Sequence, residues 1–147
     1  MASVRKGSRP KTAVAAKDPA ELVRVCARLA EDKKAEDIVV LDLRGLMYVT
    51  DFFLIVSGGN ARQLHAIQSV IHQEMSQLGV RPIGQEGSGQ DRWVLMDYGD
   101  FVVHLFDPDS RRLYDLELLW GDAPRFEWQV PPRKRSRAKT PKPPQAE

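Results

Sequence analysis

The sequence predicts one α/β domain in which helices layer on a mixed β-sheet. Segments of helical and strand periodicity follow one another in the order helix, two strands, helix, strands, helix. At 147 residues the chain is long enough for one domain with a real core. A hydrophobic fraction of 42% and three tryptophans exclude a chain that is disordered throughout.

The first helix has a clear beginning. Asp18 can cap it, Pro19 suits the first helical position, and Glu21 stands three residues after the cap to close a capping box. Its predicted buried stripe, at helical spacing, consists of Leu22, Val25, Cys26 and Leu29. The polar run 31–37 ends the helix.

Two strands and a second helix follow. Apolar residues, many of them β-branched, fill 38–43 and 52–56, which predicts two strands separated by the break at Arg44-Gly45. Asn60 can cap the next helix, with Gln63 at its third position. The buried face of that helix is predicted to comprise Leu64, Ile67, Ile71, Met75 and Leu78, and Gly79 ends it.

The last third of the chain predicts a hairpin and a final helix. A short extended piece at 80–84 contains Pro82, which marks a sheet edge or a strand end. A glycine-rich loop, 86–90, then leads into two antiparallel strands within 93–106 that are joined by a tight turn. The final helix begins at Asp107-Pro108 or Ser110, and its expected stripe is Leu113, Leu116 and Trp120, closed by Gly121.

Charge divides the chain into three parts. Residues 1–17 carry five basic residues and no acid, and residues 129–147 carry six basic residues and one acid, so each arm has a charge of +5. The body, residues 18–128, carries eleven basic and nineteen acidic residues, a charge of −8. We therefore predict a basic arm at 1–17, a folded domain at 18–128 and a basic, proline-rich tail at 129–147.

Both arms lack periodicity and are rich in Lys, Arg, Pro, Ala and Ser, so we expect them to be disordered. Two interpretations stay open: the arms only aid solubility, or they contact nucleic-acid phosphates and release counterions. The first arm also has the composition of a transit peptide but lacks its apolar face. We expect no membrane span and no signal peptide, and the single Cys26 favours a reducing compartment.

The hairpin carries the residues that most suggest a function. Strand alternation places Trp93, Leu95 and Asp97 on one side and Val94, Met96 and Tyr98 on the other, while the turn adds Asp100. Tryptophan and tyrosine beside carboxylates match the residues that anchor protein interfaces, here with a basic surface. In the alternative interpretation, Trp93 is a core aromatic and Tyr98-Gly99 only a turn.

Enzyme chemistry has little support. The Ser57-Gly58-Gly59 turn, between a strand and a helix, could hold a phosphate on free backbone amides, but it is neither a GxGxxG motif nor a Walker loop. A nucleotide-transferring enzyme would need a carboxylate pair for magnesium soon after the turn, and the first acid there is Glu74. A nucleotidyltransferase-like enzyme that uses this turn is the alternative function.

The histidines and the cysteine are interpreted as structural. His65 and His72 stand about 10 Å apart along a helix axis, too far for one metal without a further ligand. His104 is expected to be buried and hydrogen-bonded, with a partner contact as the alternative, and Cys26 is expected to lie in the core. We predict no catalytic residue, no metal and no cofactor.

Several segments together carry a family resemblance. They are Asp51-Phe-Phe-Leu-Ile-Val-Ser-Gly58, Arg62-Gln63, Glu86-Gly87, Trp93-Val-Leu-Met-Asp-Tyr-Gly-Asp100, Val103-His-Leu-Phe106, Arg112-Leu-Tyr114 and Leu116-Glu-Leu-Leu-Trp120. On these motifs the chain resembles the ribosomal silencing factors of the Iojap family over about residues 20 to 125, and both basic arms fall outside the resemblance.

The resemblance implies a non-catalytic protein that binds the large ribosomal subunit through ribosomal protein L-fourteen, on the face that meets the small subunit. Such binding sterically prevents subunit joining and lowers translation when nutrients are scarce, and the family is also linked to large-subunit maturation. The implied fold is similar to that of nucleotidyltransferases, which is no ground for inferring their activity. Bacterial members are cytoplasmic, and organellar relatives exist.

Carried onto this chain, the resemblance implies a contact surface on the hairpin. Trp93 would be its anchor, Met96 and Tyr98 would flank it, Asp97 and Asp100 would pair with basic groups, and Glu86 and Pro82 would border it. The acidic body suits a basic ribosomal protein, and the basic arms would contact nearby rRNA. An exposed aromatic patch also favours a weak homodimer when its partner is absent.

Overall fold

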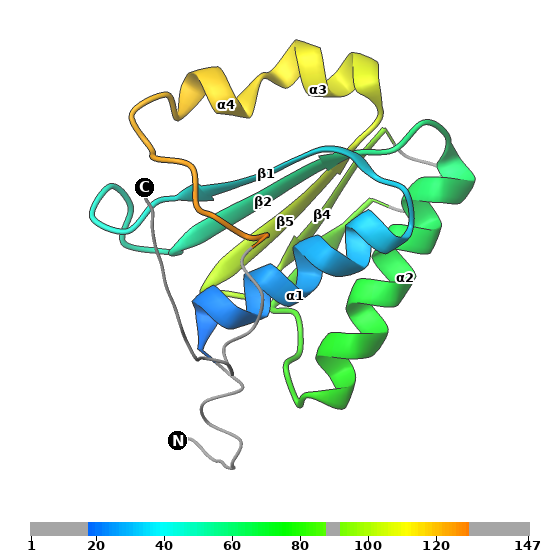
Figure 1. Ribbon diagram of the computed structural model, residues 1–147, viewed down its shortest axis with the longest axis horizontal. Helices are drawn as coiled ribbons and strands as arrows, with labels where there is room; N and C mark the ends of the chain where they lie inside the picture. The colour runs from blue at the N-terminus through cyan, green and yellow to red at the C-terminus, as the bar shows by residue number, and fades with distance from the viewer. Residues whose placement is uncertain (1–17, 88–91, 130–147) are drawn as a thin grey trace, which may run out of the picture.

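The computed structural model describes residues 18–87 and 92–129, which form one domain of three layers (Figure 1). Two long helices cover one face of a five-stranded sheet, and two short helices lie on the other face. The elements are α1 (Pro19–Asp32), β1 (Glu36–Asp42), β2 (Phe52–Ser57), α2 (Ala61–Gln77), β3 (Gly84–Glu86), β4 (Trp93–Asp97), β5 (Phe101–Phe106), α3 (Pro108–Tyr114) and α4 (Leu116–Leu119). Apart from Gln129, both predicted arms lie outside the described residues.

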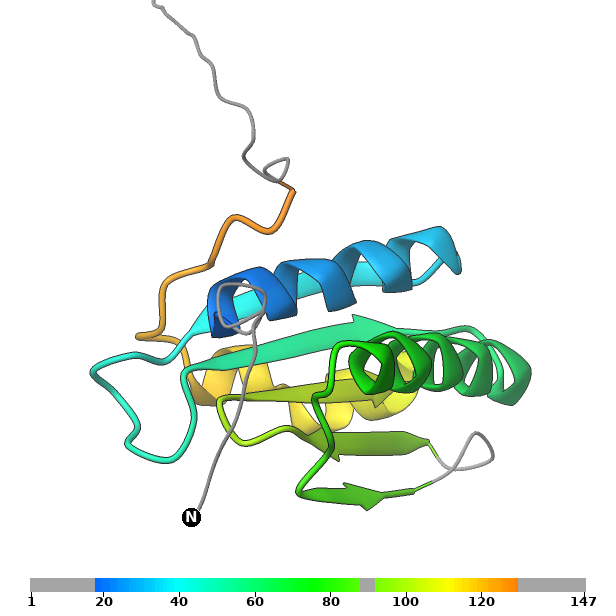
Figure 2. The same ribbon diagram turned by 90° about the horizontal axis from the view of Figure 1, so that it is seen from below.

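The sheet is mixed, as predicted. Its strand order is β1-β2-β5-β4-β3, in which β2 and β5 run parallel and every other neighbouring pair runs antiparallel. Figure 2 shows α1 beside β1 at one edge and β3 at the opposite edge. All residues of β2 and β5 are buried, because these central strands have helices on both faces, and this explains their continuous apolar runs.

The predicted helix starts are confirmed, but the stripe of α1 is partly wrong. The Asp18 side chain accepts a hydrogen bond from the Ala20 amide, whereas Glu21 pairs with Arg24 at 2.8 Å, which differs from the predicted capping box. Because α1 packs against β1, β2 and α2 together, its buried face is broad. The fully buried residues are Leu22, Val23, Cys26, Ala27 and Ala30, whereas Val25 and Leu29 are only partly buried.

Helix α2 follows the prediction closely. The Asn60 side chain accepts from the Gln63 amide at 2.9 Å, and the Gln63 side chain accepts from the Gly59 amide at 2.7 Å. Leu64, Ile67, Ile71 and Met75 are fully buried, and Leu78 packs at the edge of the same core. Gly79 follows the helix with a φ of 79°, a conformation that glycine adopts without strain.

The predicted final helix is instead two short helices. Asp115 lies between them in the left-handed region, with a φ of 42°, and its side chain caps α4 through the Leu118 amide. Because of this break, the Leu113 side chain points into solvent and is 76% exposed, whereas the sequence predicts that it is buried. Leu116 is buried and Trp120 partly buried, as expected.

A buried arginine joins these helices to the sheet. Arg111 donates to both carboxylate oxygens of Glu117, at 2.9 and 3.1 Å, and to the Ser57 hydroxyl at 2.9 Å. The positive charge is therefore fully paired where α3 and α4 meet the end of β2. Glu117 is partly exposed, and the Arg111 guanidinium holds its pKa below the ordinary value.

Two segments differ from the expected course. The third strand is Gly84–Glu86 and not 80–84, because Pro82 has no amide hydrogen for a ladder. Beyond α4, the chain returns along β1: the Asp42 amide donates to the Pro124 carbonyl, and the Phe126 amide donates to the Val40 carbonyl, both at 2.8 Å. This return of the chain covers the edge of β1 and was not predicted.

Candidate functional site

The tight turn between β4 and β5 is formed as predicted. The Tyr98 amide donates to the Phe101 carbonyl at 2.9 Å, and the Gly99 amide donates to the Asp97 carboxylate at 2.8 Å. Gly99 has a φ of 87°, and a Cβ there would approach the Ile83 side chain to 2.8 Å. The positive φ therefore favours glycine at position 99, whereas the contact would require only that the exposed end of the Ile83 side chain move.

The two sides of β4 are confirmed, but the roles of Met96 and Tyr98 are wrong. Val94, Met96 and Tyr98 face α1 and α2 in the main core, where Met96 is 0% and Tyr98 7% exposed. The Tyr98 ring stacks on Phe101 at 5.0 Å. Neither side chain is available to flank a contact, because both are on the covered face of the sheet.

Trp93 lies on the other face, half-buried in an aromatic group. Its ring centroid is 5.0 Å from that of Phe106 and 4.5 Å from that of Tyr114. The indole N–H donates to Nδ1 of His104 at 3.2 Å. These contacts fix the orientation of the ring and leave part of it accessible.

His104 is buried and hydrogen-bonded, as predicted. Burial lowers the pKa of its imidazole from 6.5 to about 4, so the ring is neutral near pH 7. An indole nitrogen only donates, so Nδ1 of His104 accepts and its proton resides on Nε2. The ring also packs edge-on against Phe53 at 4.5 Å.

The predicted carboxylates lie at three places, on β3, at the end of β4 and in the turn. Asp97 is half-buried at the end of β4, beside Gly84 of β3, and Glu86 is exposed on β3. Asp100 is exposed in the turn, where its carbonyl accepts from the Asp51 amide at 2.8 Å. Partial desolvation and the neighbouring Asp51 carboxylate raise the pKa of Asp100, so a cation placed here would relieve repulsion. Pro82 is partly buried just before β3.

Beside these residues the structure has a groove that the sequence did not reveal, hereafter the open-face groove. Its volume is about 460 Å³, and it lies between the 43–51 loop and β4. It is lined by Met47, Val49, Thr50, Phe53, Ile83, Leu95, Asp97, Gly99, Val102 and His104. Two lining residues are prominent on the surface, with Val49 79% and Ile83 74% exposed.

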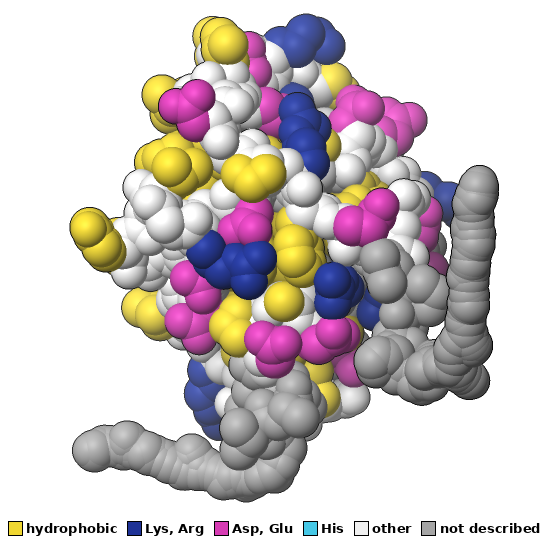
Figure 3. Space-filling model, turned by 60° about the vertical axis from the view of Figure 1, so that its left-hand side comes forward, with side chains coloured by type: hydrophobic (Ala, Val, Ile, Leu, Met, Phe, Trp, Pro, Cys, Tyr) yellow, Lys and Arg dark blue, Asp and Glu magenta, His cyan; other side chains and the backbone are white. Residues whose placement is uncertain are grey.

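Further apolar side chains are exposed around the groove. Figure 3 brings the side of the molecule with the 43–51 loop forward and shows apolar side chains protruding between acidic and basic ones. Leu46 and Tyr48 of that loop are exposed, Tyr48 completely. The sequence contains a signal for this exposed apolar surface. It is an apolar run that fits neither a helix stripe nor a strand, Leu46-Met-Tyr-Val49.

The turn suggested for phosphate binding has no free glycine amide. The Gly58 amide donates to the Phe106 carbonyl at 2.8 Å, and the Gly59 amide donates to the Gln63 side chain at 2.7 Å. The Ser57 hydroxyl is bound by Arg111. Because all three groups already have partners inside the protein, the structure argues against the nucleotide-binding alternative.

The remaining candidates have structural partners. His65 lies 3.4 Å from the Ser69 hydroxyl and His72 lies 3.2 Å from the side-chain nitrogen Nε2 of Gln85, both on the exposed side of α2. Burial raises the pKa of the Cys26 thiol well above its usual range. Among residues 18–87 and 92–129, no three His, Cys, Asp or Glu side chains are grouped as a metal site. No helix in the same residues is long and apolar enough to span a membrane.

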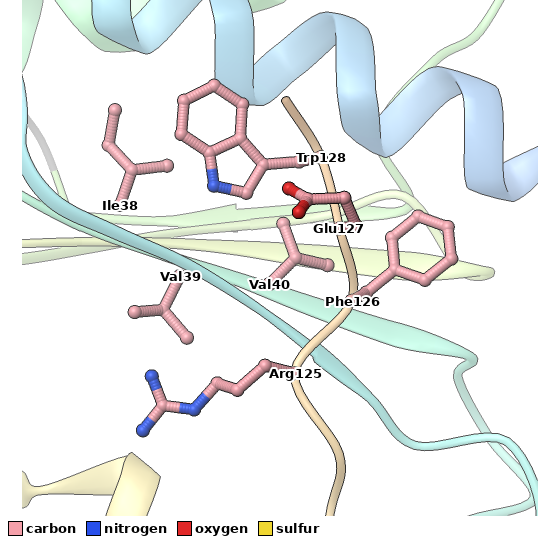
Figure 4. Close-up of a pocket in the computed structure, with 7 residues that line it drawn as sticks. All are labelled: Ile38, Val39, Val40, Arg125, Phe126, Glu127 and Trp128. Carbon is pink, nitrogen blue, oxygen red and sulfur yellow. The ribbon is translucent and has the colours of Figure 1, made fainter. Parts of the chain in front are cut away.

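A second, smaller pocket lies at the β1 edge of the sheet (Figure 4). It measures about 260 Å³ and is lined by residues 38–40 of β1 and 125–128 of the returning chain. In Figure 4 the Trp128 ring lies beside Ile38 under α1, while Arg125 points away from it. The Arg24 side chain binds the Glu127 carbonyl at 3.1 Å, which helps to hold the returning chain in place.

Comparison with known proteins gives one consistent family. A family model described as "Ribosomal silencing factor during starvation" matches residues 16–147. The chain is 44% identical over 103 residues to "Ribosomal silencing factor RsfS" of Bacillus subtilis, covering 70% of this chain and 87% of the relative. It is 37% identical over 127 residues to "Protein Iojap, chloroplastic" of Zea mays, covering 82% of this chain and 54% of the relative.

Related proteins extend to organelles and to solved structures. The mouse "Mitochondrial assembly of ribosomal large subunit protein 1" is 36% identical over 95 residues, covering 63% of this chain and 42% of the relative. A crystal structure of a Chromobacterium violaceum protein superposes with a TM-score of 0.67 at 33% identity, covering 80% of this chain and 97% of that chain. A Bacillus halodurans protein superposes with a TM-score of 0.64 at 40% identity, covering 73% and 97%.

Proposed function

Since this chain belongs to the family of ribosomal silencing factors during starvation, we propose that it binds the large ribosomal subunit through ribosomal protein L-fourteen and blocks association with the small subunit. Translation falls because a large subunit occupied on its joining face cannot accept its partner. No catalytic step is needed, and the occupied amides of Gly58 and Gly59 support a binding role over nucleotide chemistry.

The observation that carries this proposal is the fixed, partly accessible ring of Trp93, which lies on the same face of β4 as Asp97 and the open-face groove. Phe106, Tyr114 and His104 hold the ring in place before any partner arrives. A preorganised aromatic side chain loses little conformational entropy on binding. Tryptophan is also among the residues that most often dominate interface energies.

Charge supports a basic protein as the partner. The body from residue 18 to residue 128 carries a charge of −8. Asp97, Asp100 and Glu86 lie along the hairpin and its neighbouring strand. Partial burial and, to a smaller extent, the Asp51 carboxylate raise the pKa of Asp100, and a lysine or arginine of the partner would stabilise its charged form. Complementary charge speeds the encounter and fixes orientation.

Further parts of the proposal concern the arms and the setting. We assign the binding role to residues 18–128 and propose that the basic arms, 1–17 and 129–147, contact rRNA near the main contact.

The name of the mouse relative supports a second role in assembly of the large subunit. The bacterial relatives support a cytoplasmic setting, and the exposed apolar side chains around the groove support weak self-association of the free protein.

Co-sedimentation with purified large subunits tests the proposal. Trp93→Ala should weaken binding by about 2 kcal/mol, roughly 30-fold, and Trp93→Phe by less, because the smaller ring keeps part of the contact. His65→Ala, on the exposed side of α2, is the matched control and should bind as the wild type does. Thermal unfolding of each variant separates lost binding from lost folding, because Trp93 also packs on Phe106.

Two outcomes would contradict the proposal. A folded Trp93→Ala variant with wild-type affinity would remove the anchor from the contact. Loss of all binding after deletion of both arms would identify a general RNA binder, whereas the proposal expects a weaker and less salt-sensitive complex.

A further inference from the structure

Three aromatic rings meet where β4, β5 and α3 come together, hereafter the ring cluster. The ring centroid of Trp93 lies 4.5 Å from that of Tyr114 and 5.0 Å from that of Phe106, and the centroids of Phe106 and Tyr114 are 6.1 Å apart. Each ring therefore forms an aromatic pair with both others. Phe106 is fully buried and Trp93 is partly buried, whereas Tyr114 is 48% exposed, so Tyr114 presents most of the outer surface of the cluster.

Hydrogen bonds at both ends of α3 hold Tyr114 in place in the free protein. The Asp107 side chain caps the beginning of the helix. Near its end, Arg111 is bound through its guanidinium to α4 and to the end of β2. The Asp115 amide, directly after Tyr114, donates to the Arg111 carbonyl at 3.0 Å. A ring that is positioned in this way loses little conformational entropy when a partner covers it.

The apolar surface of the ring cluster is not isolated. Half of the large apolar side chains that are exposed among residues 18–87 and 92–129 lie on α3 and α4, although these helices have only 7 and 4 residues. They are Leu113, Tyr114, Leu118 and Leu119. Figure 1 shows both helices on the face of the sheet opposite α1 and α2, where no long helix covers them. An aromatic cluster beside exposed leucines is typical of an interaction surface.

Charge on the same two helices distinguishes among possible occupants. Residues 108–119 contain two basic and three acidic residues, a charge of −1. Arg111 is paired with Glu117 and Arg112 with Asp109, so these helices, which the structure describes completely, have no unpaired cation for an RNA phosphate. A second copy of the chain would bring another body of charge −8 against the first. The surface therefore favours a basic protein.

We propose that Tyr114 is a second aromatic contact for the basic ribosomal protein and is buried together with Trp93 when the two proteins bind. The inference rests on the proposed function and extends its contact surface from β4 onto α3. An apolar side chain of the partner packs against the Tyr114 ring and the adjacent Leu113, while the basic groups around it meet the acidic body. Tyrosine, like tryptophan, is frequent among the residues that dominate interface energies.

Nitration of the wild-type protein with tetranitromethane, analysed at each tyrosine by mass spectrometry, tests this burial without any substitution. The chain contains three tyrosines. In the free protein Tyr48 is completely exposed and Tyr114 is half exposed, so both should react, whereas Tyr98 is buried in the core and should not. Saturation with the isolated, purified ribosomal protein L-fourteen should remove most of the nitration at Tyr114. An equal amount of an unrelated basic protein controls for consumption of the reagent and should leave Tyr114 reactive.

Binding to the same isolated protein measures how much the ring contributes. Tyr114→Ala removes the exposed ring and should weaken binding about 10-fold, whereas Tyr114→Phe keeps the ring and should bind within about threefold of the wild type. His65→Ala, on the exposed side of α2, is again the control and should bind as the wild type does. Thermal unfolding shows whether each variant is folded, and if Tyr114→Ala is not, the nitration of the wild-type chain decides.

Four results would overturn the inference. They are full nitration of Tyr114 in the saturated complex, wild-type affinity of a folded Tyr114→Ala variant, protection of Tyr114 by rRNA fragments but not by the isolated protein, and protection at high concentration of this chain alone. In each case weaker binding of Trp93→Ala to large subunits would leave the proposed function intact. If the wild type binds neither large subunits nor the isolated protein, the proposed function fails, and this inference fails with it.

Discussion

Arg111 connects α3 and α4 to the end of β2 through hydrogen bonds. Its replacement by methionine tests how much these hydrogen bonds stabilise the fold. Arg111 is 9% exposed, and its guanidinium makes three hydrogen bonds, two to Glu117 and one to the Ser57 hydroxyl. Methionine fills a similar volume without charge. The Ser57 hydroxyl, itself buried, then loses its partner, and the Glu117 carboxylate loses its cation.

The expected loss is about 3 kcal/mol in the free energy of unfolding. Breaking a buried ion pair by removing one partner costs about 3–5 kcal/mol, and an unpaired buried hydroxyl costs about 1–3 kcal/mol. We take a value below the combined range of about 4–8 kcal/mol, because the Glu117 side chain is 23% exposed and water can partly solvate it. Removing both charges, in Arg111→Met with Glu117→Leu, should restore most of the loss.

Urea unfolding at pH 7 measures these effects, with Arg112→Met as the control. Arg112 pairs with Asp109 on the surface, so its loss should change stability by no more than about 0.5 kcal/mol. Arg111 lowers the folded-state pKa of Glu117, so the stabilisation is present above the ordinary glutamate pKa and is lost as pH falls through the lowered value. A loss below about 1 kcal/mol for Arg111→Met, or strictly additive single losses in the double variant, would refute this reasoning.

Two further predictions concern the site and the rejected phosphate turn. Because burial lowers the pKa of His104 from 6.5 to about 4, the unfolded chain binds the proton first, and stability should fall by up to ~3 kcal/mol as pH drops from 6.5 to 4. Urea unfolding across that range should show a smaller pH dependence for His104→Gln, and an unchanged dependence would contradict the assignment. Gly58→Ala should lower stability by about 1–3 kcal/mol, because its Cβ would come within 2.7 Å of the Leu64 side chain. Gly59→Ala makes only ordinary contacts, so equal melting temperatures for the two variants would contradict the packing argument.

Local signals explain what the sequence could predict. Asn60 as a cap and Gly79 as a stop define α2 within a few residues, and the apolar run of β2 indicates a strand covered on both faces. Period-two alternation correctly separates the sides of β4. Alternation does not say which side faces the larger core, and for this reason Met96 was wrongly given a contact role.

The remaining features depend on residues far apart in the chain. The open-face groove combines a loop at 43–51 with Ile83 and three strands, so no local pattern describes it. The break at Asp115 follows from its left-handed backbone, which an aspartate adopts more readily than most residues but which its neighbours do not signal. The buried position of Arg111 likewise depends on Ser57, fifty-four residues earlier.

The most direct test of the central claim is the fraction of joined ribosomes when purified subunits are mixed with this protein. We predict that wild-type protein lowers that fraction in proportion to the large subunits it occupies, and that folded Trp93→Ala does so only at a much higher concentration. Full joining on large subunits already saturated with the wild-type protein would contradict a steric block.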